Sequence, residues 1–265
     1  MNTDSTLKNL LWNGSISVRL VLSQDEARNF VDYDYYVSIN VPRLSYLHLQ
    51  LPSALQFFRP LLRHPEDADM LDWWLEFEGV PIKWNWPIGL SFDLLTNHDP
   101  NKGPDAYAEI VPWTLILHKK NYPKDRILSL DDGIETVRSY WLNQIKEASY
   151  IRYGNSKAVL NLSKDDSDSL WSHLMQTSPR NLPLRIYLPI SNSVLQYPLP
   201  HDPNQTLGAA LNACMPRLFP SKRTCVIARP VMHGVELPLR TPVGALFESG
   251  AVFCDGFVHV SLVML

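Results

Sequence analysis

Residues 79–93 read GVPIKWNWPIGLSFD, and residues 234–248 read GVELPLRTPVGALFE. Both stretches have a Gly-Val pair and then a Pro-x-Gly-x-x-Phe segment closed by an acid, with 155 positions between aligned residues. Self-similarity at a fixed spacing indicates an internal duplication, although two loops could match by chance. We expect the proline to set the approach to a turn, the glycine to adopt a close or left-handed backbone, and the phenylalanine to fill the core beneath.

The segments around these stretches repeat in the same order. The first copy has four predicted strands and one predicted helix, in chain order 16–22, 35–41, 52–62 (the helix), 73–82 and 113–118. The second copy has the same series at 184–190, 194–199, 206–215 (the helix), 226–237 and 257–265. Two strands, a helix and two further strands in a unit of this size are typical of the ubiquitin-like β-grasp. Its last strand inserts parallel to its first.

The region between the copies has a helical pattern. Asp131 or Asp132 is expected to cap a helix. The apolar stripe of that helix comprises Ile134, Val137, Trp141, Ile145 and Ala148. A second helix is expected to begin at Ser163, with Trp171, Leu174 and Met175 on one face. The sequence therefore predicts a small helix-rich domain between two sheets.

The predicted fold class is α+β, with two ubiquitin-like β-grasp domains flanking a small helix-rich domain. The expected boundaries are 1–12 for an N-terminal helix, 13–120 for the first ubiquitin-like domain, 121–180 for the helix-rich domain and 181–265 for the second ubiquitin-like domain. Residues 96–111 are expected to form a mobile loop inside the first copy.

Composition narrows the possible functions. The 265 residues carry a net charge of −3, so no overall basic field favours nucleic acid. The chain has no apolar run of the roughly 18 residues that cross a bilayer, and its first residues do not resemble a signal peptide. The three cysteines lack metal-site spacing and are expected to be free thiols in a reducing compartment. We therefore expect a cytoplasmic protein that does not bind nucleic acid.

Motifs for catalysis are missing. The sequence contains no phosphate-binding loop, dinucleotide fingerprint or nucleophile elbow, and its histidines lack zinc-site spacing. Cys214 with His233 or His259 could form a nucleophile and base, but a core cysteine is the simpler interpretation. Two other interpretations stay open. Glu76 and Glu78 could form an acidic pair or a solvated strand edge. Four of the eight tryptophans cluster in the sequence and could form core or a partner groove: Trp73, Trp74, Trp84 and Trp86. No catalytic residue, cofactor or metal is predicted.

The sequence ends Val263-Met264-Leu265 inside a predicted strand. A ubiquitin-like modifier needs a flexible tail ending in glycine, because the terminal carboxylate is the group that is transferred. We therefore expect this protein not to donate in such chemistry. It could still accept a modifier through a lysine.

Several stretches resemble one family, that of autophagy protein 5. They are residues 77–95 (FEGVPIKWNWPIGLSFDLL), 10–22 (LLWNGSISVRLVL), 41–47 (VPRLSYL), 153–163 (YGNSKAVLNLS), 182–189 (LPLRIYLP) and 255–263 (DGFVHVSLV). They span nearly the whole chain in family order, and the compact length is similar to budding-yeast-type members. The resemblance implies two ubiquitin-like domains around a helix-rich one.

The resemblance also implies that the chain accepts the ubiquitin-like autophagy protein 12. The family's pattern W-x-x-Q-x-K runs here from Trp141 to Lys146. Lys146 would form an isopeptide bond with the modifier's terminal glycine, by aminolysis of a thioester on an E2-like enzyme. Lys146 lies about 100° around the helix from Ile145 on the buried stripe, so its amine can face solvent. A lysine that is merely solvated is the alternative.

Further partners follow from the same resemblance. A helix of autophagy protein 16 would bind non-covalently in a groove among the three domains. We expect this groove to involve Leu11, Trp12, Trp86 and Pro242. The conjugate would act like an E3, stimulating transfer of autophagy protein 8 to phosphatidylethanolamine. The E2-like autophagy proteins 10 and 3 would bind transiently, and the assembly would lie peripherally on preautophagosomal and autophagosomal membranes.

Two questions stay open after the resemblance. The lipid-contacting residues could be Arg59 and Arg63, or Lys119, Lys120 and Lys124, although each could be ordinary solvated charge. The alternative function is a scaffold with two ubiquitin-like domains that binds helices and is never modified.

Overall fold

A computed structural model describes residues 14–29, 34–69, 71–103, 106, 108–130, 132–161, 181–189, 193–200, 202, 204–248 and 255–265. Several expectations lie outside the described residues: the N-terminal helix at 1–12, the groove residues Leu11 and Trp12, the cap candidate Asp131, the helix from Ser163, and Cys254. In the part of the chain that is described, no helix combines the length and the apolar character needed to span a membrane.

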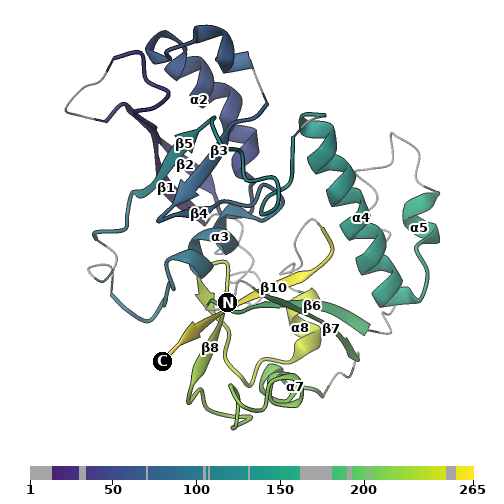
Figure 1. Cartoon of the computed structure of the whole chain (residues 1–265). Helices are drawn as coiled ribbons and strands as arrows, with labels where there is room; N and C mark the ends of the chain where they lie inside the picture. Colours follow the sequence, from purple (N-terminus) through teal and green to yellow (C-terminus); the bar gives the residue numbers. More distant parts are fainter. Residues whose placement is uncertain are drawn as a thin grey trace.

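The first copy folds into a five-stranded sheet. Its strands are β1 (Ser15–Leu22), β2 (Tyr36–Pro42), β3 (Trp74–Phe77), β4 (Val80–Pro81) and β5 (Trp113–His118). Their order in the sheet is β2-β1-β5-β3-β4, and β5 runs parallel to β1 while the other neighbours are antiparallel. Ile16, Val18 and Leu20 of β1 face the core, as their alternation predicts. This is the expected β-grasp, seen in the upper part of Figure 1.

The second copy repeats this sheet. Its strands are β6 (Asn181–Tyr187), β7 (Val194–Pro200), β8 (Ala228–Met232), β9 (Val235–Glu236) and β10 (Val258–Met264). The order β7-β6-β10-β8-β9 matches the first sheet position by position, with β10 parallel to β6. The prediction of two ubiquitin-like folds is confirmed.

Two of the predicted strands are each two shorter strands in the structure. The segments 73–82 and 226–237 each fold as a tight hairpin, β3–β4 and β8–β9, instead of one continuous strand. The turns are Glu78-Gly79, with φ of 49° and 78°, and His233-Gly234, with φ of 48° and 80°. Two successive left-handed residues match the twist of the flanking strands and reverse the chain within two positions. The turns occupy equivalent positions in the two copies.

The Pro-x-Gly segments form helices, so the expected turn there is wrong. They are α3 (Ile88–Leu95) and α8 (Val243–Glu248). Pro87 is the N-cap of α3, because a fixed φ suits the entry to a helix. Gly89 is helical instead of left-handed, but the expected close approach is correct: a Cβ there would lie 2.8 Å from the Cβ of Arg43. Glycine is needed at this position by packing.

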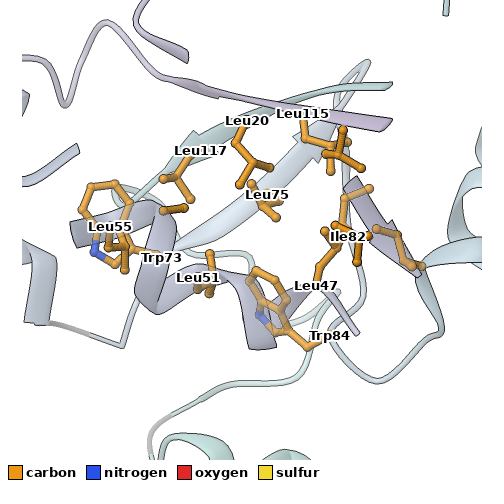
Figure 2. Packing of buried hydrophobic residues seen from close by; sticks show 14 of the residues in the cluster. Leu20, Leu47, Leu51, Leu55, Trp73, Leu75, Ile82, Trp84, Leu115 and Leu117 are labelled. Atoms are coloured by element: carbon orange, nitrogen blue, oxygen red, sulfur yellow. The ribbon is translucent and has the colours of Figure 1, made fainter. Parts of the chain in front are cut away.

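Helices cover one face of each sheet. The first sheet carries η1 (Leu47–Gln50), α2 (Leu51–Phe58), η2 (Arg59–Leu61) and η3 (Pro65–Asp69), and the second carries α7 (Leu207–Cys214). Figure 2 shows Leu51 and Leu55 of α2 facing Leu75 and Leu117 of the sheet, with Trp73 and Trp84 closing the sides of the core. Trp73 and Trp84 are fully buried, so these two tryptophans are core residues.

The helical region between the copies contains α4 (Ile134–Tyr153) and α5 (Lys157–Leu160), which lie beside the second sheet in Figure 1. Gly133 is the N-cap of α4 in place of the expected aspartates, because its φ of 62° lets the chain turn into the helix. Ala148 of α4 comes so close to Gly256 that a Cβ on this glycine would lie 2.7 Å away. The long helix is thereby seated directly against the second unit.

Candidate functional site

The two ubiquitin-like units are joined through a buried carboxylate. Asp93, near the end of α3, accepts a 2.7 Å hydrogen bond from Nη1 of Arg43 and a 2.7 Å bond from the backbone N–H of Gly234. Arg43 also lies over the ring of Phe92. Burial raises the pKa of Asp93 above its ordinary value, and the Arg43 guanidinium opposes this rise. The contact connects helix α3 of the first unit to the β8–β9 turn of the second.

A second contact involves the loop expected to be mobile. Asp99 is buried and accepts a 2.5 Å bond from Nη1 of Arg229 on β8, while Asn101 donates to Glu236 on β9. Arg229 also pairs with Glu236 at 3.2 Å. The first part of the 96–111 loop is therefore anchored on the second sheet, because its polar side chains find charged partners there.

The expected groove residue Trp86 lies between the units. Its ring meets that of Tyr187 edge to face at 5.1 Å, and the Lys83 ammonium lies 4.3 Å from its centroid. Tyr187 in turn hydrogen-bonds Nδ1 of His259 at 2.8 Å, and Nε2 of His259 lies 3.1 Å from Asp255. Trp86 thus covers a buried polar network of the second unit.

A cavity of about 450 Å³ opens where the first unit, α4 and the second unit meet. It is lined by Tyr46, His48, Asn85, Glu135, Val137, Arg138, Tyr140, Trp141, Gln144 and Asp255. Neither Trp86 nor Pro242 is among these residues. Pro242 is exposed and is bridged to Thr206 at the start of α7, so the structure does not bring it to this cavity.

Sequence reasoning missed most of this lining. Tyr46 and Asp255 lie in the stretches 41–47 and 255–263 that carried the family resemblance, which was the available signal. The polar residues from α4 were missed because hydrophobic periodicity marks only the apolar face of a helix.

Lys146 lies on α4 with its side chain half-exposed. On one flank Ile145 is buried with Val159 of α5 and Trp141. On the other flank Glu147 contacts the second unit. Among the described residues, no carboxylate forms an ion pair with the Lys146 ammonium, and the residue is neither buried nor fully exposed.

The alternative nucleophile and base do not come together. The Cys214 thiol donates to the Leu211 carbonyl at 3.6 Å, and burial raises the pKa of this thiol. Both ring nitrogens of His259 are engaged, by Tyr187 and Asp255. Burial lowers the pKa of His233 to about 3. Within the described chain, no group of three or more histidine, cysteine or acidic side chains is placed to hold a metal ion.

Glu76 and Glu78 do not form the acidic pair that the sequence left open. Glu76 lies on β3, where it accepts a 3.0 Å bond from the N–H of Gly79 and lies 3.4 Å from His118. Glu78 belongs to the turn, so the two carboxylates do not share a strand face as expected. Glu76 stabilises the hairpin turn through its bond to the Gly79 N–H.

Most of the cations considered for lipid contact border a second cavity, of about 370 Å³, on the first unit. Its charged lining residues are Asp25, Glu26, Arg63, Asp67, Asp72, Lys119, Lys120 and Lys124. Lys119 pairs with Asp67 at 2.9 Å, and Arg59 outside the cavity pairs with Asp69. The carboxylates offset the cations, so this cavity does not present a basic surface.

Comparison with known proteins agrees with this architecture. Three family models match in succession: "Autophagy protein ATG5, UblA domain" over residues 11–119, "alpha-helical bundle region" over 134–181 and "UblB domain" over 181–262. Autophagy protein 5 of Pichia angusta is 36% identical over 278 residues, covering 96% of this chain and 95% of that protein. The Aspergillus clavatus protein of the same name is 33% identical, covering 98% of each chain.

One solved structure shows the same fold. The crystal structure of Kluyveromyces marxianus Atg5 superposes with a TM-score of 0.73 at 23% identity, covering 97% of this chain and 99% of that one.

Proposed function

The chain belongs to the autophagy protein 5 family, and on this premise we propose that it accepts the ubiquitin-like autophagy protein 12 on Lys146. The observation that carries the proposal is the placement of Lys146: half-exposed, unpaired among the described residues, and on a helix whose flanks contact both α5 and the second unit. Such a support holds the backbone of Lys146 and leaves its side chain without an ion-pair partner among the described residues.

The reaction is aminolysis of a thioester. The neutral Lys146 nitrogen attacks the thioester carbonyl of the modifier's terminal glycine, a C–N bond forms, and the C–S bond breaks. The sulfur leaves as the thiolate of the E2-like enzyme, autophagy protein 10, and the nitrogen loses a proton. Free lysine is almost wholly protonated at neutral pH, so a base must act, and we assign this base to the E2-like enzyme.

We place the helical partner, autophagy protein 16, in the cavity among the three units. Tyr46, Tyr140 and Trp141 offer aromatic surface there, which suits the apolar face of an amphipathic helix. Residues from all three units line the cavity, so binding would also brace their relative positions. Trp86 contributes indirectly, through its contact with Tyr187.

The conjugate would then stimulate transfer of autophagy protein 8 from the E2-like autophagy protein 3 to phosphatidylethanolamine. In this proposal the chain supplies surfaces and an acceptor amine, with no catalytic residue and no cofactor of its own. It would act in the cytoplasm and peripherally on the preautophagosomal membrane.

A reconstituted conjugation reaction tests the acceptor. The wild-type chain should shift by one modifier mass on a denaturing gel, Lys146→Arg should abolish the shift, and Lys157→Arg should leave it intact. Peptide mapping of the wild-type product should find the branch on Lys146. A shifted band from Lys146→Arg would contradict the proposal. No shift at all, with helix binding retained, would favour the unmodified scaffold.

A further inference from the structure

We propose that Glu147 is the positioning residue for the acceptor lysine. It clamps the turn of α4 that carries Lys146 onto the sheet of the second ubiquitin-like unit, and so sets the direction in which the amine faces. This inference rests on the proposed role of Lys146 and adds a requirement to it.

Glu147 uses both carboxylate oxygens in this contact. Oε1 accepts a 2.7 Å bond from Nε2 of Gln196 on β7, and Oε2 accepts a 3.2 Å bond from Nη2 of Arg185 on β6. Arg185 and Gln196 face each other in the β6–β7 register, and Nε of Arg185 donates to Oε1 of Gln196 at 2.9 Å. The three side chains form a closed ring between one helix and two strands.

Arg185 is itself held in place. Its side chain is only 13% exposed, and its guanidinium lies 3.7 Å from the centroid of the buried Phe257 ring. Packing on Phe257 and the bond to Gln196 restrict the guanidinium, so Glu147 is bonded to a well-held side chain of the second unit.

The helix geometry explains why this matters for Lys146. Successive residues of an α-helix are turned by about 100°, so Ile145 and Glu147 lie on opposite flanks of Lys146. Ile145 is buried against Val159 of α5, and Glu147 is bonded to β6 and β7. With both flanks in contact, rotation of this turn about the helix axis is restrained, and on this proposal the lysine lies between the two contacts.

The ring is better suited to orientation than to stability. The Glu147 side chain is 43% exposed, and an ion pair at such a position contributes little to folding. Reaction rates respond more strongly to geometry, since misplacing a reacting group by about 1 Å can cost roughly 100-fold. Loss of Glu147 is therefore expected to slow transfer while leaving the chain folded.

The test is single-turnover transfer from the E2-like enzyme charged with its modifier as a thioester. The acceptor is the full chain at varied concentration, and the maximal rate is separated from the half-saturating concentration. Glu147→Ala should lower the maximal rate by at least about fivefold with the half-saturating concentration unchanged, as expected for lost positioning. The maximal rate of Glu147→Gln should lie between those of the wild type and Glu147→Ala, because an amide has one acceptor oxygen instead of two. Glu109→Ala, at an exposed carboxylate before β5, is the matched control and should equal the wild type.

Two results would overturn the clamp. One is a maximal rate and a half-saturating concentration that are both unchanged in Glu147→Ala. The other is a raised half-saturating concentration at an unchanged maximal rate, which would make Glu147 a docking residue for the E2-like enzyme. If Glu147→Ala fails to fold, Gln196→Ala removes one arm of the ring from the strand side and is judged by the same two criteria.

The parent proposal is tested separately by Lys146→Arg. Conjugation that persists in Lys146→Arg would contradict the proposal that Lys146 is the acceptor. Conjugation abolished by Lys146→Arg but unaffected by Glu147→Ala would remove only the clamp.

Discussion

Asp93 of helix α3 accepts a 2.7 Å hydrogen bond from the backbone N–H of Gly234, which lies in the β8–β9 turn of the other ubiquitin-like unit. The two residues belong to the two duplicated stretches, residues 79–93 and 234–248. The duplicated pattern therefore shapes each unit and also supplies both sides of the junction between them.

Replacing Asp93 should weaken this junction. The Asp93 side chain is fully buried, and that of Arg43 is only 11% exposed, so Asp93→Asn leaves a buried guanidinium without its counter-ion. Breaking such a pair costs about 3–5 kcal/mol. We expect a loss of about 3 kcal/mol in the free energy of unfolding, measured in denaturant, and no comparable loss in Asp125→Asn at the surface. A loss below about 1 kcal/mol, the range of exposed pairs, would show that the bridge is not structural.

The two equivalent turn glycines should respond differently to alanine. Gly79 and Gly234 have similar φ, 78° and 80°, but a Cβ on Gly79 meets nothing within 4 Å, whereas one on Gly234 would lie 2.6 Å from Cζ of Arg43. Gly79→Ala should cost about 1–2 kcal/mol for the left-handed backbone alone. Gly234→Ala should cost about 1–3 kcal/mol more, because Arg43 must move. Equal losses in thermal or denaturant unfolding would contradict the close approach.

Stability should fall in mild acid because of His233. Burial lowers its pKa to about 3, and His259 and Arg43 add to the effect. An unfolded histidine has a pKa of about 6.5. Below that pH the unfolded state is therefore protonated at this residue, while His233 in the folded state stays neutral. The contribution of neutral His233 to the free energy of unfolding is therefore fully present above about pH 6.5. It is lost as the pH falls toward 3, at up to about 1.4 kcal/mol per pH unit.

The variant His233→Asn isolates this contribution. Asparagine tolerates the left-handed φ of 48° at this turn, so the substitution removes the titration and keeps the backbone. The pKa of His48 and that of His98 are also lowered by burial, so the variant should retain part of the slope between pH 6.5 and 4.5. If the free energy of unfolding depends on pH in the same way in wild type and variant, the acid sensitivity does not come from His233.

The cavity among the three units can be tested by partner binding. Tyr46→Ala removes an aromatic side chain from the lining and should weaken binding of the helical partner by about tenfold, or about 1.4 kcal/mol. Conjugation on Lys146 should be unchanged, because Tyr46 lies in the first unit. Tyr36→Ala, at a 51% exposed tyrosine of edge strand β2, is the control for calorimetric titration. Equal affinities for all three chains would mean that the helix binds elsewhere.

Much of the fold could be predicted from local patterns. Alternation in β1 and the three-to-four-residue spacing in α4 each describe one element facing one core, so both are readable within ten to twenty residues. The errors were also local. The β3–β4 and β8–β9 turns were missed because Glu78 and His233 are unusual residues at a left-handed position, and only the glycines that follow them signal a turn.

The candidate site was only partly predictable. A family pattern predicts Lys146 as the acceptor, and this stays a prediction. The ring of Glu147, Arg185 and Gln196 was not predicted, because its members come from a helix and two strands far apart in the chain. Trp86 contacts Tyr187 of the second unit, and this contact depends on how the units dock. Its predicted role in the partner groove stays a prediction.

By itself the sequence determined two β-grasp units, a helix between them and the turn glycines at matching positions, because backbone sterics and hydrophobic periodicity act over a few residues. Tertiary structure alone decided the bond from Asp93 to Gly234, the cavity shared by three units and the contact of Glu147 with Arg185 and Gln196. These features bring together groups that are far apart in the chain, so no periodic sequence pattern predicts them. They become defined only when apolar burial brings the folded units together.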